Sequence, residues 1–186
     1  ARSADVAPHS RHIGAYPQRQ QALSYLGVVA PLGRLAIQQL RELADLSRVY
    51  GSGMLRLTPW QNVLIPDVPT ERVPVLHQAI ERLGLHDSAT HPWSALVACT
   101  GNRGCGASAT DTTGHALELA NHLAQHGHLD QPVNIHLSGC TKSCAQHHRS
   151  DIALLGITVQ QGDTTVEGDR DRVGAQEQAF GRVLTD

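Results

Sequence analysis

Four cysteines arranged in two close pairs constrain the fold of this chain more than any other feature. Cys99 and Cys105 form a C-x5-C motif, Cys140 and Cys144 form a C-x3-C motif, and 34 residues separate the two pairs. Both pairs lie in loops rich in glycine, which lets backbone N–H groups approach a bound group closely. Four thiolates are the ligand set of a four-iron four-sulfur cluster, so we expect one such cluster on these cysteines.

Other uses of the four cysteines stay open at this point. Two disulfides are disfavoured because the chain is neither very short nor visibly secreted. Burial of the cysteines as small apolar side chains fits poorly with pairs that lie inside polar, glycine-rich loops. A structural zinc ion also accepts four thiolates, although neither pair has the C-x2-C spacing of a zinc knuckle. An iron-sulfur cluster therefore ranks above these alternatives.

The charge and hydropathy of the chain exclude several classes of partner. The 15 Lys and Arg residues against 17 Asp and Glu residues give a net charge of −2, so no electrostatic signal for nucleic acid or an acidic membrane is present. No stretch approaches eighteen apolar residues, and the first residues lack the apolar core of a signal peptide. We expect a cytoplasmic protein that binds neither nucleic acid nor membranes.

The first half of the chain has the pattern of a ferredoxin-like unit. A short buried strand precedes a helical repeat of leucines, two β-rich runs joined by Pro59-Trp60-Gln61 suggest a hairpin, and a second helix begins after Thr70. The order strand, helix, strand, strand, helix is the split βαβ pattern, which we assign to a half-domain over residues 1–88. The expected elements are strand 25–30, helix 32–50, strands 54–58 and 62–66, and helix 71–83.

The second half has the texture of an α/β unit, which we expect to be a cluster-binding domain over residues 89–186, incomplete at its C-terminus. Both cysteine pairs follow predicted strands, and strand ends are where α/β folds usually place their chemistry. In the predicted helix, Leu117, Leu119 and Leu123 suggest the apolar side and leave His122 and His126 facing solvent. The expected elements are strand 95–98, helix 108–125, and strands 133–137 and 152–155.

One stretch near the end argues against a further buried strand. Residues 167–172 carry five charges in six positions, and burial of an unpaired charge is costly. We expect this segment to be exposed or disordered.

The two cysteine motifs, together with HIGAYPQRQ at 12–20 and RLTPWQNVLIP at 56–66, resemble the C-terminal half of the nitrite and sulfite reductase superfamily. The resemblance covers about residues 11–157. It implies an α+β fold in which a ferredoxin-like split βαβ unit is followed by an α/β cluster-binding unit. It also implies that an N-terminal half of the enzyme is missing from this chain.

The resemblance assigns roles to individual residues. All four cysteines would bind the cluster, and Cys144 would also bridge it to the iron of siroheme in a reductase. Arg56, Thr58, Gln61 and Asn62 would line a tetrapyrrole pocket, where charged and amide donors suit a macrocycle that bears many carboxylates. Lys142, between the second pair of cysteines, would contact a macrocycle carboxylate, offset the charge of the cluster or be solvated. No catalytic residue is assigned.

The second cysteine motif distinguishes branches of the superfamily. Assimilatory reductases usually read G-C-P-N-x-C, whereas residues 138–145 read S-G-C-T-K-S-C-A, which looks more like precorrin-3B synthase, an oxidoreductase of cobalamin synthesis. We therefore expect a synthase-like enzyme with a precorrin substrate, and we expect this fragment to be inactive alone. The first alternative is a nitrite or sulfite reductase that uses siroheme and takes electrons from ferredoxin or NAD(P)H. The second is a non-enzymatic iron-sulfur module.

Overall fold

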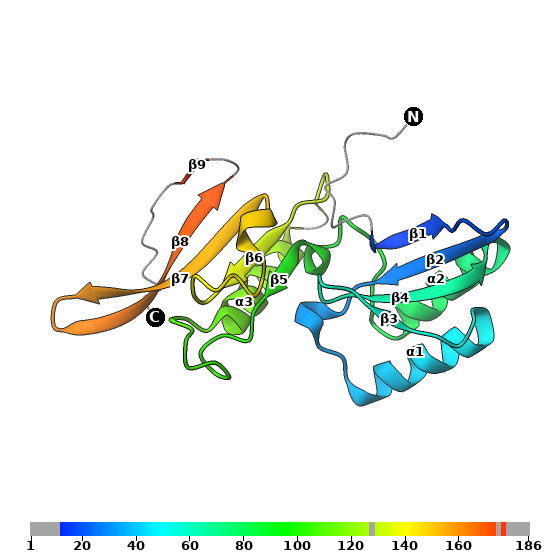
Figure 1. Ribbon diagram of the computed structural model, residues 1–186, viewed down its shortest axis with the longest axis horizontal. Helices are drawn as coiled ribbons and strands as arrows, with labels where there is room; N and C mark the ends of the chain where they lie inside the picture. Colours follow the sequence, from blue (N-terminus) through cyan, green and yellow to red (C-terminus); the bar gives the residue numbers. More distant parts are fainter. Residues whose placement is uncertain (1–11, 127–128, 174–175, 178–186) are drawn as a thin grey trace. The chain divides into compact units, whose positions relative to one another are not determined.

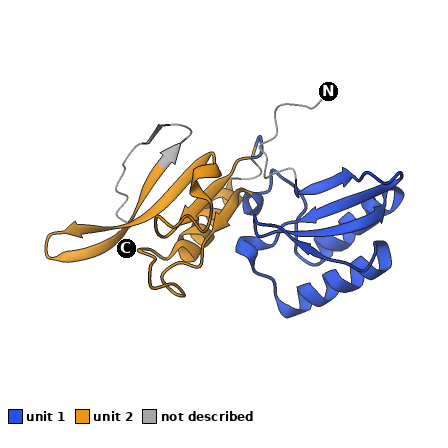
Figure 2. Cartoon of the chain, viewed as in Figure 1, with its two compact units in different colours: residues 1–94, 130–132 blue, residues 95–129, 133–186 orange. Residues whose placement is uncertain are grey.

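The computed structural model describes residues 12–126, 129–173 and 176–177. The chain divides into two compact units, which Figure 2 colours separately. Unit 1 comprises residues 1–94 and 130–132, and unit 2 comprises residues 95–129 and 133–186. The boundary that the sequence suggested between two functional domains, at residue 88, stays a prediction.

Unit 1 is an antiparallel sheet packed against two helices (Figure 1). The strands lie in the order β1-β2-β4-β3, so β3 is an edge strand. The fully buried core joins Leu26 of β2 and Ile65 of β4 to Leu43, Leu76 and Ile80 of the helices. The elements are β1 Gly14–Pro17, β2 Leu23–Val28, α1 Ile37–Tyr50, β3 Arg56–Leu57, β4 Val63–Pro69 and α2 Val73–Arg82, with short 3-10 turns at Pro31–Gly33 and Thr70–Arg72.

The predicted hairpin is confirmed, because β3 pairs antiparallel with β4 through Arg56↔Leu64 and Leu57↔Val63. The predicted start of the first helix at residue 32 is wrong. Leu32 and Gly33 both adopt positive φ angles, of 51° and 70°, which break a right-handed helix before it can form. The helix begins at Ile37 instead.

Unit 2 is a mixed five-stranded sheet in the order β5-β6-β7-β8-β9. The first three strands run parallel, and β7, β8 and β9 pair antiparallel as a long ribbon (Figure 1). Helix α3 packs on β5 and β6. The elements are β5 Leu96–Ala98, α3 Thr112–Gln125, β6 Ile135–Ser138, β7 Ile152–Gln161, β8 Thr164–Val173 and β9 Gln176–Glu177, with 3-10 turns at Pro92–Ala95 and His147–Arg149.

The charged stretch at 167–172 forms a regular strand, so the alternative that it is disordered was wrong, whereas the expectation of an exposed segment holds for part of it. It lies within β8 and pairs with β7 from Ile152↔Val173 to Gln161↔Thr164. Glu167 and Arg170 are exposed, as expected, whereas Asp169 is half-buried. The strand tolerates Asp169 because His115 lies 3.2 Å from its carboxylate.

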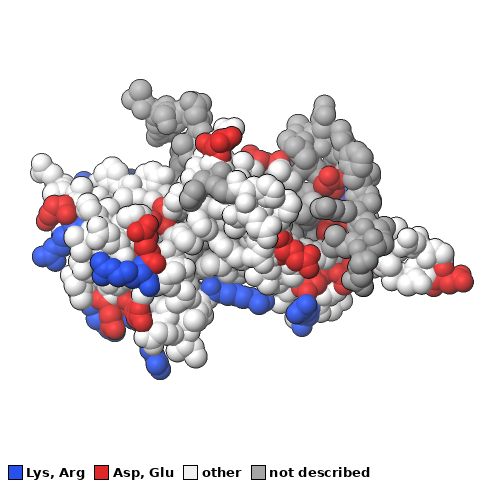
Figure 3. Space-filling model, turned by 180° about the vertical axis from the view of Figure 1, so that it is seen from behind, with Lys and Arg blue, Asp and Glu red and all other residues white. Residues whose placement is uncertain are grey.

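The α+β fold class, with its ferredoxin-like unit and its cluster-type unit, is confirmed by this architecture. Acidic and basic side chains are interspersed on the face shown in Figure 3, in keeping with the small net charge. Within the described parts of the chain, none of the helices has the length and hydropathy needed to cross a membrane.

Candidate metal centre

The two cysteine loops leave the same edge of the parallel part of the sheet in unit 2. Strands β5 and β6 pair through Ala98↔Leu137, so both strands end at the same edge of the sheet. Cys99 follows β5 directly, and its backbone N–H donates to Leu137 O at 3.0 Å. Cys140 comes two residues after β6. The order of two adjacent parallel strands therefore brings together loops that lie far apart in the sequence.

The two loops contact each other directly at Gly139. Its carbonyl oxygen accepts a hydrogen bond from Ala109 N at 2.7 Å, and its N–H donates to Cys99 Sγ at 3.3 Å. A Cβ at this position would overlap Ser108 Oγ and lie 2.8 Å from Ser108 Cβ. Only glycine allows the loops this close.

The four cysteines differ in accessibility. None forms a disulfide; Cys99 and Cys140 are half-buried, whereas Cys105 and Cys144 are exposed. Among the residues that the structure describes, no three His, Cys, Asp or Glu side chains gather as the ligands of one metal ion. This does not conflict with a cluster of four irons, because each thiolate then binds a different iron and the sulfur atoms lie farther apart.

The first cysteine loop, residues 99–111, is closed by its own hydrogen bonds. Asn102 N donates to Thr110 O at 2.9 Å, and Cys105 N donates to Gly101 O at 2.9 Å. The hydroxyl of Thr112 donates to Cys99 O at 2.9 Å and lies 3.4 Å from Cys99 Sγ. The sulfur of Cys99 therefore accepts from the N–H of Gly139, whereas the hydroxyl of Thr112 uses its one proton for Cys99 O and only lies beside the sulfur.

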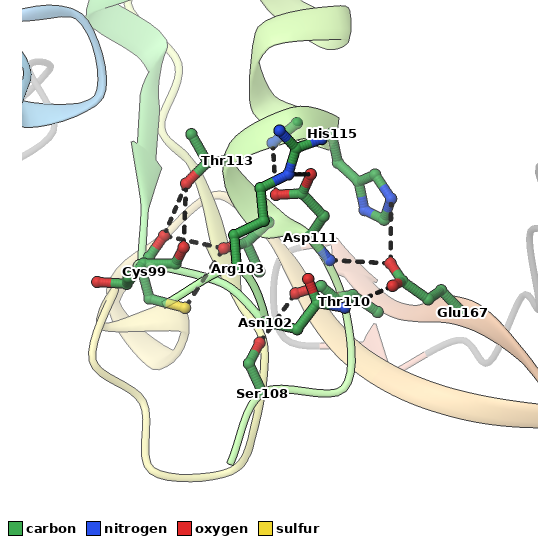
Figure 4. A network of polar contacts seen from close by, with 12 residues as sticks. Cys99, Asn102, Arg103, Ser108, Thr110, Asp111, Thr113, His115 and Glu167 are labelled. Atoms are coloured by element: carbon green, nitrogen blue, oxygen red, sulfur yellow. Dashed lines mark hydrogen bonds and ion pairs between the residues drawn. The ribbon is translucent and has the colours of Figure 1, made fainter. Parts of the chain in front are cut away.

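Strand β8 and helix α3 support the far end of this loop (Figure 4). Asp111 caps α3 by accepting from Gly114 N at 3.0 Å, and Arg103 Nε lies 2.5 Å from its other carboxylate oxygen. Glu167 on β8 accepts from Asn102 Nδ2 at 2.5 Å and from Asp111 N at 2.9 Å. The loop is thus tied to the antiparallel ribbon.

His115 on α3 completes this network. Its Nδ1 lies 3.2 Å from Asp169 Oδ2, and its Nε2 lies 3.7 Å from Glu167 Oε2. The hydrogen bond to Asp169 raises the pKa of His115 above its usual value, against the opposing effect of burial, and the charges of Asp169, Glu167 and Glu118 add to the rise.

The second cysteine loop, residues 139–146, is held from within the sheet. His136 on β6 is fully buried, and its Nδ1–H donates to Gln146 O at 3.1 Å. Burial lowers the pKa of His136, so the ring is neutral at physiological pH. Ser143 and Gln146 adopt left-handed φ angles of 59° and 53°. Lys142, which the sequence placed near a macrocycle, is exposed between the two cysteines.

The residues expected to line a tetrapyrrole pocket lie in unit 1 and differ in their surroundings. Arg56 is exposed on the edge strand β3. Thr58 and Asn62 close the turn that follows, because Asn62 N donates to Thr58 Oγ1 at 3.1 Å and Thr58 N to Asn62 O at 2.9 Å. Asn62 is 7% exposed, and its Oδ1 accepts from Ala30 N at 3.3 Å. Gln61 is half-buried, with a φ of 62°.

Two buried hydroxyls at the base of the cysteine loops provide a test of whether a group fits there. Thr110 and Ser138 are 0% and 1% exposed, and among the described residues neither hydroxyl oxygen has a hydrogen-bond partner. Buried hydroxyls are normally paired, so a group bound between the loops would complete their hydrogen bonding. Together with four reduced cysteines on two touching loops, this chemistry fits an iron-sulfur cluster.

Sequence reasoning did not find Glu167, His115 or His136 as supports of the cysteine loops. For Glu167 the only signal in the sequence was a run of charges, which pointed to solvent. His136 falls inside an apolar strand pattern, where a lone buried polar residue indicates a hydrogen-bonding role.

Family models match both halves of the chain. Residues 16–83 match the nitrite/sulfite reductase ferredoxin-like half domain, and residues 92–168 match the nitrite and sulphite reductase 4Fe-4S domain. The second match contains all four cysteines and Glu167.

Individual relatives agree with the family models. A chloroplastic ferredoxin–nitrite reductase of Zea mays is 36% identical over 154 residues, covering 82% of this chain and 27% of that protein. Sulfite reductase [ferredoxin] 2 of Mycolicibacterium paratuberculosis is 33% identical over 188 residues, covering 96% and 34%. The solved structure of the Mycobacterium tuberculosis NirA protein superimposes with a TM-score of 0.77 at 30% identity, covering 94% of this chain and 33% of that one. The chain spans about a third or less of each relative.

Proposed function

The chain belongs to the nitrite and sulfite reductase superfamily through both of its units, and we propose that it is the cluster-binding part of a ferredoxin-dependent nitrite or sulfite reductase. Cys99, Cys105, Cys140 and Cys144 would each bind one iron of a four-iron four-sulfur cluster. The observation that carries the proposal is the direct contact of the two cysteine loops at Gly139, inside the segment that matches a 4Fe-4S domain.

The chain's own groups are suited to hold a negatively charged cluster. The N–H of Gly139 donates to Cys99 Sγ at 3.3 Å, and donors to a cluster sulfur raise the reduction potential of the cluster. Lys142 places one positive charge between Cys140 and Cys144. Exposed Cys105 and Cys144 leave two ligands accessible to an incoming cluster or to its neighbouring cofactor.

Siroheme would be the second cofactor, with Cys144 as the ligand shared with the cluster. When bound, it would supply a redox-active iron at which the substrate anion can be reduced. Arg56 and Lys142 would pair with carboxylates at the rim of the macrocycle. Asn62 stays a candidate through its side-chain Nδ2, since its Oδ1 already accepts a hydrogen bond from Ala30 N. Gln61 and Thr58 stay candidates for contacts with the macrocycle.

The named relatives favour a reductase over precorrin-3B synthase. The synthase reading rested on the motif S-G-C-T-K-S-C-A alone, whereas relatives named as nitrite or sulfite reductases match 77% to 96% of this chain. A role in cobalamin synthesis therefore has no support beyond that motif. The names of these relatives also favour ferredoxin as the electron donor.

The test is anaerobic reconstitution of the whole chain with iron, sulfide and siroheme, compared with the Cys144→Ser variant. We expect the wild-type chain to bind siroheme next to its cluster and to give visible bands that shift on addition of nitrite or sulfite. The Cys144→Ser variant is expected to lose the coupled spectrum. A cluster without siroheme binding, combined with oxygen-dependent conversion of precorrin-3A, would replace the reductase by the synthase. A cluster with neither property would leave a redox module.

A further inference from the structure

A single carboxylate on β8 holds both ends of the first cysteine loop. Glu167 Oε1 accepts from the side chain of Asn102 at 2.5 Å, near the start of the loop. Glu167 Oε2 accepts from the backbone N–H of Asp111 at 2.9 Å, at the end of the loop (Figure 4). The two oxygens of one side chain therefore fix two points between which Cys105 lies.

The position of this carboxylate is set by the sheet and not by the loop. Glu167 pairs with Thr158 in the long ladder between β7 and β8. Asn102 and Asp111 are 65 and 56 residues away in the sequence. Glu167 thus ties the loop that follows β5, at the other edge of the sheet, to the β7–β8 ribbon.

Charge reinforces the two hydrogen bonds. An ionised acceptor makes stronger hydrogen bonds than a neutral one, and His115 on α3 lies 3.7 Å from Glu167 Oε2. The Glu167 side chain is 41% exposed, so solvent screens part of the attraction to His115. The short hydrogen bonds to Asn102 and Asp111 are accordingly the main contribution.

We propose that Glu167 is a positioning residue for the cluster: it fixes the loop that carries Cys99 and Cys105, and so sets how tightly the chain retains its iron. The inference rests on the proposed cluster site and adds to it a residue outside the cysteine motifs. Glu167 does not touch the cluster in this account. It acts through Asn102 and Asp111.

Three variants separate positioning from a general effect of charge. Glu167→Ala removes both acceptors. Glu167→Gln keeps the shape, because its carbonyl can accept from Asp111 N–H while its amide donates to a rotated Asn102 side chain. Asp163→Ala is the matched control, since Asp163 is an exposed carboxylate in the turn of the same β7–β8 ribbon.

Two measurements on the whole chain report on the loop. Release of iron from the reconstituted protein to a chelator is expected to be at least about tenfold faster in Glu167→Ala than in Asp163→Ala, because the loss of even one of the two hydrogen bonds corresponds to about that factor. Glu167→Gln is expected to stay close to wild type. In the protein without cluster, amide hydrogen exchange is expected to speed up at Asp111 and within residues 99–111 of Glu167→Ala, while the rest of unit 2 keeps its protection.

The results that overturn the inference are equally specific. Equal rates of iron release from Glu167→Ala and Asp163→Ala would overturn it. A loss of amide-exchange protection spread evenly over unit 2 in Glu167→Ala would also overturn it, because it would indicate a purely structural role. If the wild-type chain takes up no cluster at all, the proposed function fails. The exchange measurement at Asp111 still tests the positioning by Glu167 in that case, so the two failures are distinguishable.

Discussion

Replacement of Gly139 by alanine is the perturbation that tests most sharply how the cysteine loops meet. The new Cβ would overlap Ser108 Oγ and would lie 2.8 Å from Ser108 Cβ and 3.3 Å from Thr112 Cγ2. Rotation of the Ser108 hydroxyl removes the first clash but breaks its hydrogen bond to Thr110 O, at 2.9 Å. The contact with Ser108 Cβ remains, so the backbones of the two loops must separate.

The expected cost follows from these two effects. Overpacking of a closely packed site costs about 1–3 kcal/mol, and one lost hydrogen bond adds about 1 kcal/mol. We therefore expect Gly139→Ala to lower the free energy of unfolding of unit 2 by about 2–4 kcal/mol. Gly106→Ala is the matched control in the first cysteine loop, because no heavy atom lies within 4 Å of its added Cβ. It should change stability by less than about 0.5 kcal/mol.

Equilibrium unfolding in urea, followed by far-ultraviolet circular dichroism on the protein without cluster, measures both variants. Ser108→Gly in the Gly139→Ala background removes both Ser108 contacts and should recover part of the loss. Equal unfolding midpoints for Gly139→Ala and Gly106→Ala would refute the close approach of the loops, as would a double variant no more stable than Gly139→Ala.

Two further predictions concern stability in each unit. His115 has a raised pKa through its hydrogen bond to Asp169, so its stabilising effect is complete below the unfolded pKa of about 6.5 and is lost as the pH rises through the higher folded pKa. The stability difference between wild type and His115→Gln should therefore be larger at about pH 5.5 than at about pH 9, and urea unfolding at the two pH values would contradict the assignment if the order were reversed. Asn62→Ala leaves Ala30 N without its side-chain acceptor and should destabilise unit 1 by about 1–3 kcal/mol, whereas Arg56→Ala on the exposed edge strand should cost less than about 0.5 kcal/mol. Equal effects of these two substitutions in thermal unfolding would show that Asn62 is not part of the scaffold.

Much of the framework could be predicted from local patterns. Alternation of apolar and polar residues predicted the hairpin that β3 and β4 form, and the runs before Cys99 and Cys140 predicted the strands β5 and β6. These patterns are local consequences of which face of each strand is buried, so a single sequence is enough to read them.

The apolar side of α3 could not be read in the same way. Leucines at 117, 119 and 123 suggested that side, yet Leu117 is 42% exposed, and the buried positions are Thr112, Thr113, Ala116 and Ala120. Helix α3 packs on β5 and β6, and small side chains permit that approach. Which face of α3 is buried depends on its packing partners, β5 and β6. The sequence of the helix alone does not identify them.

The support of the first cysteine loop depended on contacts that are distant in sequence. A run of charges is usually solvated, and the expectation for 167–172 followed that rule. In the structure Glu167 meets Asn102 and Asp111, and Asp169 meets His115, each from more than fifty residues away. Whether a charged side chain is solvated or bound within the protein depends on such partners. The role of Glu167 could therefore be found only from the structure.

The central claim is that one iron-sulfur cluster is held jointly by the two cysteine loops. Its most direct test is the iron and acid-labile sulfide content of the chain after anaerobic reconstitution, for the wild type and for a variant with Cys99 and Cys140 changed to serine. The account predicts about four iron and four sulfide per wild-type chain, and a loss of this stoichiometry in the variant. Wild-type protein that holds zinc or no metal, or a variant that keeps a full cluster, would contradict it.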